Sequence, residues 1–141
     1  MKRPSAATTW LPGLVLASAT AVLAGCSPPP PSLAEVSGLV VCDGVPLAGA
    51  CVVLTPDRDR GTRGPISWGR AGPDGRFTLL ADGQPGAVVG HHRVSVALQP
   101  TEPGTGKRPA RRYRQPDTSG LTAEIRAGRV NELILRLEAG D

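Results

Sequence analysis

The sequence predicts an all-β protein whose short strands form the two packed sheets of a β-sandwich. From residue 35 onward, apolar residues recur at every second position, and turn-forming residues interrupt this pattern every eight to twelve residues. Both features are typical of strands rather than helices. The chain shows no convincing amphipathic helix and no internal repeat. Seven short strands of this kind fit a sandwich of two sheets.

Turn signals separate the seven predicted strands. Asp43-Gly44 ends the first strand because both residues accept a positive φ, and Pro56 stops the second. A tight turn at residues 72–75 precedes the strand that contains Phe77, which we expect to be buried. The predicted strands cover residues 36–42, 50–54, 66–71, 76–80, 93–98, 121–126 and 130–137. Alternation points Val94, Val96, Leu98, Leu133, Leu135 and Leu137 inward.

Residues 1–25 have the composition of an export signal rather than of a folded segment. Lys2 and Arg3 supply a positive start, and an apolar stretch from Trp10 to Ala24 follows. This stretch is shorter than the roughly 20 residues that a membrane-spanning helix needs. Its length and flanks match a secretory signal peptide. The alternatives are an ordinary secreted protein and an uncleaved segment.

The signal ends in Leu23-Ala24-Gly25-Cys26, which resembles the bacterial lipobox. The small residues let the backbone enter the signal peptidase, and the Cys26 thiol is the nucleophile that accepts diacylglycerol. We therefore expect a lipoprotein whose mature chain begins at Cys26. Its two or three acyl chains would anchor it stably to a membrane. Ser27, standing where Asp would favour inner-membrane retention, favours the outer membrane. The domain would then lie in the periplasm or at the cell surface.

A proline-rich spacer separates this anchor from the domain. Residues 28–31 are four consecutive prolines, which cannot join a helix or a central strand and form a stiff polyproline II segment. We assign residues 26–34 to the spacer and residues 35–139 to the sandwich domain.

The charge of the chain argues against a nucleic-acid partner. Its 16 Lys and Arg residues fall to 14 when Lys2 and Arg3 leave with the signal, against 12 Asp and Glu. A net charge this mild does not favour nucleic acid, which an exported protein would rarely meet. Asp57 and Asp59 lie in a loop without the spacing of a calcium-binding EF-hand. We expect them to be solvated and balanced by the neighbouring arginines.

Cys42 and Cys51 are the cysteines left once Cys26 is acylated. An oxidising compartment favours a disulfide between them, and a hairpin across their eight-residue connection would place them opposite each other. Strand parity argues against the pairing, because Cys42 shares a face with Val40 whereas Cys51 lies on the face opposite Val52. The sequence leaves both outcomes open.

Five short motifs occur in order between residues 35 and 138. They are Val36-Ser37-Gly38-x-Val40, Gly44-x-Pro46-Leu47-x-Gly49-Ala50-x-Val52, Asp74-Gly75-Arg76-Phe77-x-Leu79, Gly90-His91-His92-Arg93-Val94-x-Val96, and Tyr113-x-x-Pro116-x-Thr118-Ser119-Gly120-Leu121-Thr122 followed by Gly128 and Asn131. Together they resemble the carboxypeptidase regulatory-like domain, a transthyretin-like sandwich common in bacterial envelope proteins. The resemblance implies a seven-stranded Greek-key, immunoglobulin-like arrangement. It says little about activity, because function resides in sites carried on folds.

The candidate catalytic and metal features have simpler structural explanations. His91 and His92 are neighbours in a predicted strand, so their rings point to opposite faces and cannot easily bind one metal ion. His92 shares the parity of Val94 and occupies a position where the family usually has Tyr, so we expect it at the edge of the core. The transthyretin-like hydroxyisourate hydrolases end in Tyr-Arg-Gly-Ser, which this chain lacks at residues 137–141. We expect no metal site, no cofactor and no enzymatic activity.

A basic run in the long connection before residue 120 is the most unusual feature beside the family pattern. It carries five positive charges in eight residues: Lys107, Arg108, Arg111, Arg112 and Arg114. One interpretation is contact with anionic lipid head groups, lipopolysaccharide or acidic glycans, each charge contributing on the order of 1 kcal/mol near an anionic surface. The other is a solvated arginine-rich loop.

These observations predict a non-enzymatic, lipid-anchored protein of the cell envelope whose sandwich binds another envelope protein or a surface. The alternative is a carbohydrate or cell-wall glycan binding module. Trp68 and Tyr113 could line one small sugar site, although packing of Trp68 in the core or across a sheet edge is the simpler expectation.

Overall fold

The computed structural model describes residues 29–99 and 106–140, together with the isolated positions 5, 13, 25 and 27. The predicted lipidation site Cys26 and nearly all of the predicted signal peptide lie outside the described residues. Among the described residues, no helix is long and apolar enough to cross a membrane.

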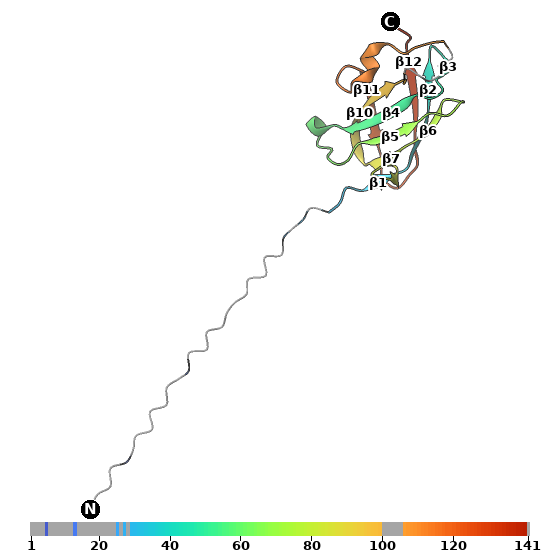
Figure 1. Ribbon diagram of the computed structural model, residues 1–141. Helices are drawn as coiled ribbons and strands as arrows, with labels where there is room; N and C mark the ends of the chain where they lie inside the picture. Colours follow the sequence, from blue (N-terminus) through green and yellow to red (C-terminus); the bar gives the residue numbers. More distant parts are fainter. Residues whose placement is uncertain are drawn as a thin grey trace, which may run out of the picture.

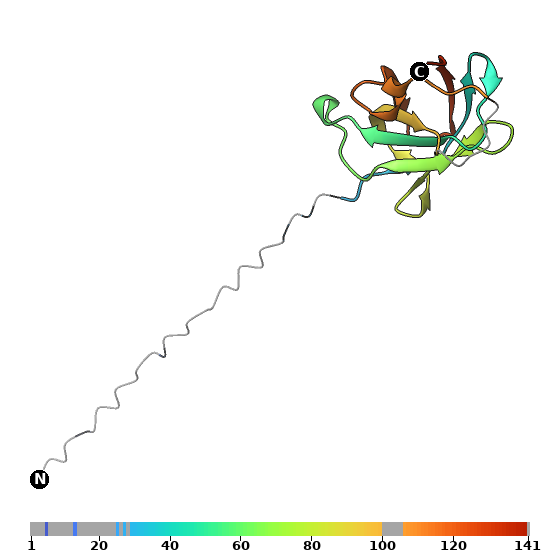
Figure 2. The same ribbon diagram turned by 45° about the horizontal axis from the view of Figure 1, so that its top comes forward.

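Two sheets account for most of the strands (Figure 1). The larger sheet contains, in spatial order, β11 (Leu121–Ile125), β10 (Gly90–Ala97), β4 (Cys51–Pro56), β5 (Ser67–Arg70), β7 (Leu80–Ala81) and β8 (Gln84–Pro85). The smaller sheet contains β12 (Asn131–Leu137), β2 (Val36–Cys42), β3 (Val45–Pro46) and β6 (Arg76–Thr78), with β3 and β6 both paired to β2. Figure 2 shows β4 and β5 running side by side. A separate pair joins β1 (Leu33–Ala34) to β9 (Ala87–Val88).

The predicted all-β sandwich is confirmed, and six of the seven predicted runs each coincide with one strand. The run 76–80 divides instead into β6 and β7, which belong to different sheets. Five strands of two residues each, β1, β3, β7, β8 and β9, were not resolved as separate elements by the sequence pattern. All strand pairs in the described part of the chain are antiparallel except β12 with β2, which is parallel over seven residues. The exact seven-strand Greek-key arrangement stays a prediction.

The core lies between the two sheets and is built from the inward side of each strand. Val40 from the smaller sheet and Val52, Leu54, Val94 and Val96 from the larger sheet are fully buried. The predicted burial of Phe77, Leu135 and Leu137 is confirmed, whereas Leu98 and Leu133 are only partly buried. Alternation therefore identified the core-facing sides of β10 and β12.

The chain changes sheets at Leu79, between β6 and β7. The Leu79 side chain is 1% exposed, and its backbone N–H donates to Val36 O over 3.2 Å. Next to this crossing, Gly69 of β5 leaves room for the backbone of Thr78, because a β-carbon at Gly69 would overlap the Thr78 carbonyl. The absence of a side chain at residue 69 is thus a condition for the crossing.

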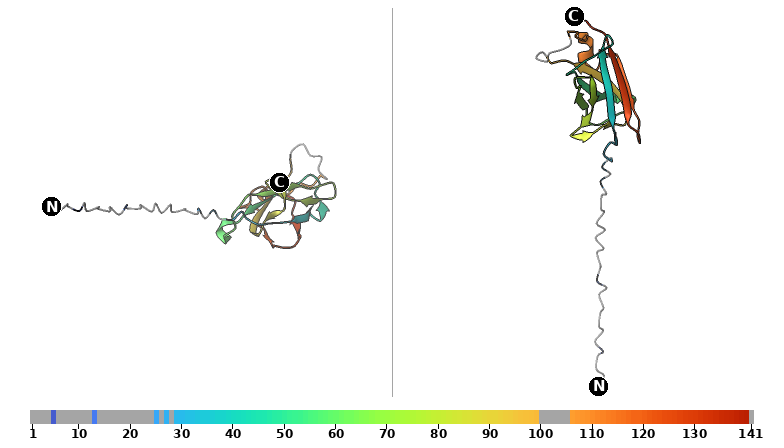
Figure 3. Two further views of the ribbon diagram at one scale, coloured as in Figure 1. Left: turned by 90° about the horizontal axis from the view of Figure 1, so that it is seen from below. Right: turned by 90° about the vertical axis from the view of Figure 1, so that its right-hand side faces the viewer.

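The two ends of the sandwich differ. The N-terminal segment joins the domain at β1, and the 3₁₀ turn η2 (Arg111–Arg114) lies at the opposite end beside the C-terminus (Figures 1 and 3). A second 3₁₀ turn, η1 (Arg58–Arg60), follows β4. The strand β1, at the end of the predicted spacer, and the basic run are therefore separated by the length of the strands.

Candidate functional site

The most exposed aromatic residue of the described chain lies on the outer face of the larger sheet. Trp68 is 53% exposed, while its neighbours Ser67 and Gly69 point inward and are buried. The expectation that Trp68 packs in the core or across a sheet edge is therefore wrong, since β5 lies between β4 and β7 inside the larger sheet. Strand parity is the reason, because residues 67 and 69 take the inward positions.

Apolar side chains continue from Trp68 across the sheet. The register places Val53 beside Trp68 on one side and Leu80 on the other, and Pro85 follows beside Leu80. We call Val53, Trp68, Leu80 and Pro85 the Trp68 row. Leu80 is 41% exposed, and Ile66, two residues before Trp68, is also exposed. Aromatic residues are enriched in the cores of protein interfaces, so this row is the best candidate contact surface of the domain.

The sequence allowed Tyr113 and Trp68 to line one sugar site, but the structure separates the two residues. The Tyr113 ring is 3% exposed and belongs to the core cluster. Its hydroxyl accepts hydrogen bonds from Arg112 Nη2 over 2.8 Å and from the Glu138 backbone N–H over 3.1 Å. This residue therefore fixes η2 to the C-terminal strand. The pattern around residue 113 gave no sign of burial, because a single 3₁₀ turn is too short to show periodicity.

The five basic residues of the predicted anionic contact divide into two groups. Arg112 Nη2 lies 2.8 Å from Glu138 Oε2, and Lys107 Nζ lies 3.5 Å from Asp43 Oδ2. Within the part of the chain that the structure describes, Arg108, Arg111 and Arg114 are exposed and form no ion pair. Arg111 and Arg114 are three residues apart in a 3₁₀ turn, which places them on one side. These three arginines are the remaining candidates for anionic contact, which stays a prediction.

Cys42 and Cys51 are both free thiols and lie in different sheets. Cys42 ends β2 and is fully buried in the core, where burial raises the pKa of its thiol. Cys51 begins β4 and points to the outer side, opposite Val52. The hairpin that would have placed the two thiols opposite each other is not formed, because β2 pairs with β3 and β4 pairs with β5. The two side chains thus point to opposite sides of their sheets, as strand parity predicted, and the disulfide stays a prediction.

Asp57 and Asp59 belong to an ion-pair network in which only the contact of Asp57 with its neighbour Arg60, at 3.8 Å, was expected from the sequence. Arg93 reaches Asp59 at 2.8 Å, Asp57 at 3.6 Å and Asp117 at 2.6 Å. The hydrogen bond with Asp117 and then the charge of Asp57 raise the pKa of Arg93. Asp57 is only 7% exposed, so the expected solvation of this carboxylate is wrong. The network holds the loop after β4 and the loop after η2 against β10.

His92 is buried in the core rather than at its edge. Its side chain is 1% exposed, and Nε2 lies 2.7 Å from Val88 O, to which it donates as the neutral tautomer. Nδ1 has no hydrogen-bond partner in the described structure. Burial is the main cause that lowers the pKa of His92, against the opposing effect of the Val88 carbonyl. No group of three or more His, Cys, Asp or Glu residues within residues 29–99 and 106–140 has the geometry to hold a metal ion.

The neutral state of His92 predicts a loss of stability in mild acid. Below the unfolded-state pKa of about 6.5, the unfolded chain binds a proton that the folded chain does not. The free energy of unfolding should therefore be constant above this pH and fall below it, by up to about 1.4 kcal/mol per pH unit. Urea unfolding at pH 7.5, 6.5 and 5.5 measures this slope. His92→Gln should abolish it and His91→Gln should retain it; a wild-type midpoint independent of pH would contradict the assignment.

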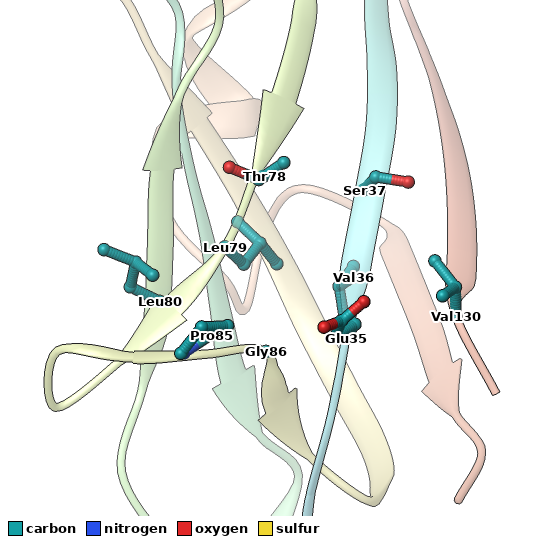
Figure 4. Close-up of a pocket in the computed structure, with 9 residues that line it drawn as sticks. All are labelled: Glu35, Val36, Ser37, Thr78, Leu79, Leu80, Pro85, Gly86 and Val130. Atoms are coloured by element: carbon teal, nitrogen blue, oxygen red, sulfur yellow. The ribbon is translucent and has the colours of Figure 1, made fainter. Parts of the chain in front are cut away.

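A groove of about 290 Å³ opens where the chain changes sheets (Figure 4). Its walls come from the start of β2, from Thr78 to Leu80, from the turn after β8 and from Val130. Glu35 is its only charged lining residue, beside the hydroxyls of Ser37 and Thr78. Leu80 belongs both to this groove and to the Trp68 row, so the two features adjoin.

No family model, no curated protein and no solved structure matches this chain. The resemblance to the carboxypeptidase regulatory-like domain therefore rests on the five sequence motifs alone.

Proposed function

We propose that this chain is a lipid-anchored protein of the cell envelope whose sandwich binds an envelope protein through the Trp68 row. The observation that carries this proposal is the 53% exposure of Trp68 between Val53 and Leu80 on an open sheet face. Exposed apolar patches tend to mark interaction sites in soluble domains. A sheet offers such a patch as a rigid surface, because the backbones of β4, β5 and β7 are each paired on both sides.

The anchor belongs to the same proposal. Cys26 follows a charged start, an apolar run and small residues, and it carries the acyl chains that hold the protein to a membrane, with the outer membrane favoured. The five motifs resemble the carboxypeptidase regulatory-like domain, a sandwich common in bacterial envelope proteins, and so support the envelope location. The proline-rich segment 28–31 places the domain a short distance from the anchored residue.

The position of the basic run bears on what it contacts. The segment from the anchor arrives at β1, and η2 lies at the opposite end of the sandwich. The segment with Arg108, Arg111 and Arg114 therefore lies at the end away from the anchoring membrane when the strands stand upright on it. An acidic surface of the bound protein suits this geometry better than the head groups of the membrane that holds the anchor.

Glycan binding is the second candidate function, and the exposed Trp68 ring is the observation that favours it. Aromatic rings serve as stacking platforms for sugars. The burial of Tyr113 removes the second platform that a shared sugar site required. A glycan would therefore rest on Trp68 alone, with Leu80 and Pro85 beside it.

Replacing Trp68 by alanine should weaken binding of the envelope protein, and so its recovery, without unfolding the domain. The ring is half exposed, so the core stays packed, while truncation of an interface Trp commonly costs at least about tenfold in affinity. The measurement is in-cell cross-linking of the tagged full-length chain, followed by detergent extraction and mass spectrometry of what co-purifies.

Val45→Ala is the matched control, because Val45 is an exposed apolar residue of the smaller sheet. Undiminished recovery of the same protein with Trp68→Ala would overturn the proposed surface. Recovery of glycan alone, lost with Trp68→Ala, would establish the second candidate instead. Cys26→Ser tests the anchor in the same cells through the incorporation of labelled fatty acid. The wild type should be labelled and Cys26→Ser should not, and equal labelling of the two would overturn the lipid anchor at Cys26.

A further inference from the structure

The strand β12 is an edge of the smaller sheet. Its seven residues pair with β2 on one side, and no strand of the described chain pairs with it on the other. Figure 3 shows β2 and β12 side by side, with β12 at the margin of the molecule in the right-hand view. Such an edge presents backbone groups that another strand can pair with.

The hydrogen bonds to β2 and the loop after it identify which backbone groups are free. Asn131 N–H donates to Glu35 O, and Asp43 N–H donates to Leu137 O. The odd-numbered residues of β12 therefore point their backbone groups toward β2. The even-numbered residues Glu132, Ile134 and Arg136 point theirs toward the open edge. Farther along, Ala110 N–H donates to Glu138 O, which closes the edge beyond Arg136.

The side chains of these same three residues lie on the outer face. Glu132 and Arg136 are exposed and form no ion pair in the described structure, and Ile134 is 53% exposed. The sequence Glu132-x-Ile134-x-Arg136 is self-complementary when read in the opposite direction. We infer that β12 pairs with β12 of a second copy of this chain, antiparallel and centred on Ile134.

Only this register pairs the free backbone groups with each other and also places opposite charges face to face. Centred on Ile134, each even-numbered residue faces an even-numbered residue, so opposing residues exchange both of their backbone hydrogen bonds. Glu132 of each copy then lies opposite Arg136 of the other, and the two Ile134 side chains meet between the ion pairs. A shift of the centre by one residue places Glu132 or Arg136 opposite Ile134 and leaves the charges unpaired.

The apolar contact continues beyond the two central strands. Ile134 lies beside Leu39 of β2 in the register of the smaller sheet, so a Leu39–Ile134–Ile134–Leu39 row would cross the joined sheet. Charged residues on an edge strand can also serve to prevent pairing. Here they have opposite signs and are placed symmetrically about an exposed apolar residue, which favours pairing with an identical strand.

Antiparallel pairing turns the β1 ends of the two copies in opposite directions. If both copies are anchored in one membrane, as the proposed function states, the strands of the dimer lie along the membrane surface, so the upright orientation described above applies to a single copy. The pairing itself does not depend on the anchor, so the two proposals can fail separately.

The test is the mass of the full-length chain in density-matched detergent, measured by sedimentation equilibrium over a range of concentrations. The wild type should form a dimer. Glu132→Arg should weaken it by about tenfold or more, because the introduced arginine of each copy then faces Arg136 of the other. The double variant Glu132→Arg/Arg136→Glu should restore it, because both ion pairs return with their signs exchanged.

Mixing the two single variants gives the sharpest result. Neither Glu132→Arg nor Arg136→Glu should dimerise well alone, but together they should form a one-to-one dimer in which every opposing pair is attractive. Far-ultraviolet circular dichroism of each variant checks that the sandwich is folded. A monomeric wild type, a dimer unaffected by Glu132→Arg, or a failure of the two single variants to combine would each overturn the proposal.

Discussion

Gly69→Ala should destabilise the domain by about 3 kcal/mol or more. Inserting even one methyl group into a packed core commonly costs about 1–3 kcal/mol, and here the obstacle is backbone. A β-carbon at residue 69 would overlap the Thr78 carbonyl oxygen and lie 3.2 Å from Leu79 Cδ2. Thr78 cannot move freely, because β6 is paired with β2 directly before the crossing.

Thermal unfolding measures this effect, and the expected loss corresponds to a fall in Tm of about 10 °C or more. Gly72→Ala is the matched control. A β-carbon there would meet only the Asp74 side chain, at 3.3 Å, and the Arg76 carbonyl at an ordinary contact distance of 3.8 Å; the exposed carboxylate can rotate away. A Tm of Gly69→Ala within about 2 °C of the wild-type Tm would contradict the close approach of the Thr78 backbone to Gly69.

Asn131→Asp should have a comparable effect through lost hydrogen bonds. The Asn131 side chain is 7% exposed; its Oδ1 accepts from Arg126 N–H, and its Nδ2 lies 3.1 Å, 3.2 Å and 3.3 Å from the carbonyl oxygens of Arg126, Arg129 and Glu35. Aspartate would place a negative oxygen among these three acceptors. We expect a loss of about 3 kcal/mol or more at pH 7, since a buried charge without donors is more costly than a missing bond.

The dependence on pH distinguishes this cause from a loss of packing. The repelled carboxylate has a raised pKa, so acid should protonate it in the folded state and reduce the destabilisation relative to the wild type. Urea unfolding of both proteins at pH 7 and pH 4.5 gives that difference. Asn131→Ala should lose less stability than Asn131→Asp at pH 7, and its loss should not shrink in acid. Equal losses in the two variants at both pH values would contradict the role of Nδ2.

The long strands were predictable because their pattern reflects the two-sided environment of a sheet. Val94 and Val96 alternate with polar neighbours, and the structure buries both. The short strands were not predictable, because a two-residue strand such as β3 exists only through its partner and shows no periodicity of its own. The division of residues 76–80 also escaped detection. Alternation continues through Leu79, and only the distant Gly69 indicates where the backbone must pass.

The candidate sites were less predictable than the fold. The sequence identified Trp68 and the arginines of η2, but not which of them would be exposed or paired. Tyr113 is buried because η2 turns it inward. Arg93 forms ion pairs with Asp57, Asp59 and Asp117, all of which are far from Arg93 in the sequence. The free edge of β12 depends on its parallel pairing with β2, which no local pattern encodes.

That parallel pairing also determines how the domain responds to tension. A pull on the N-terminal segment acts through β1 along the axis of β2, which is joined to β12 over seven residues. The hydrogen bonds between the two strands are then loaded together in shear, rather than opened one after another from an end. With the C-terminal end of β12 held, the domain would thus resist extraction far better than its equilibrium stability implies, because forced unfolding is governed by the unfolding rate.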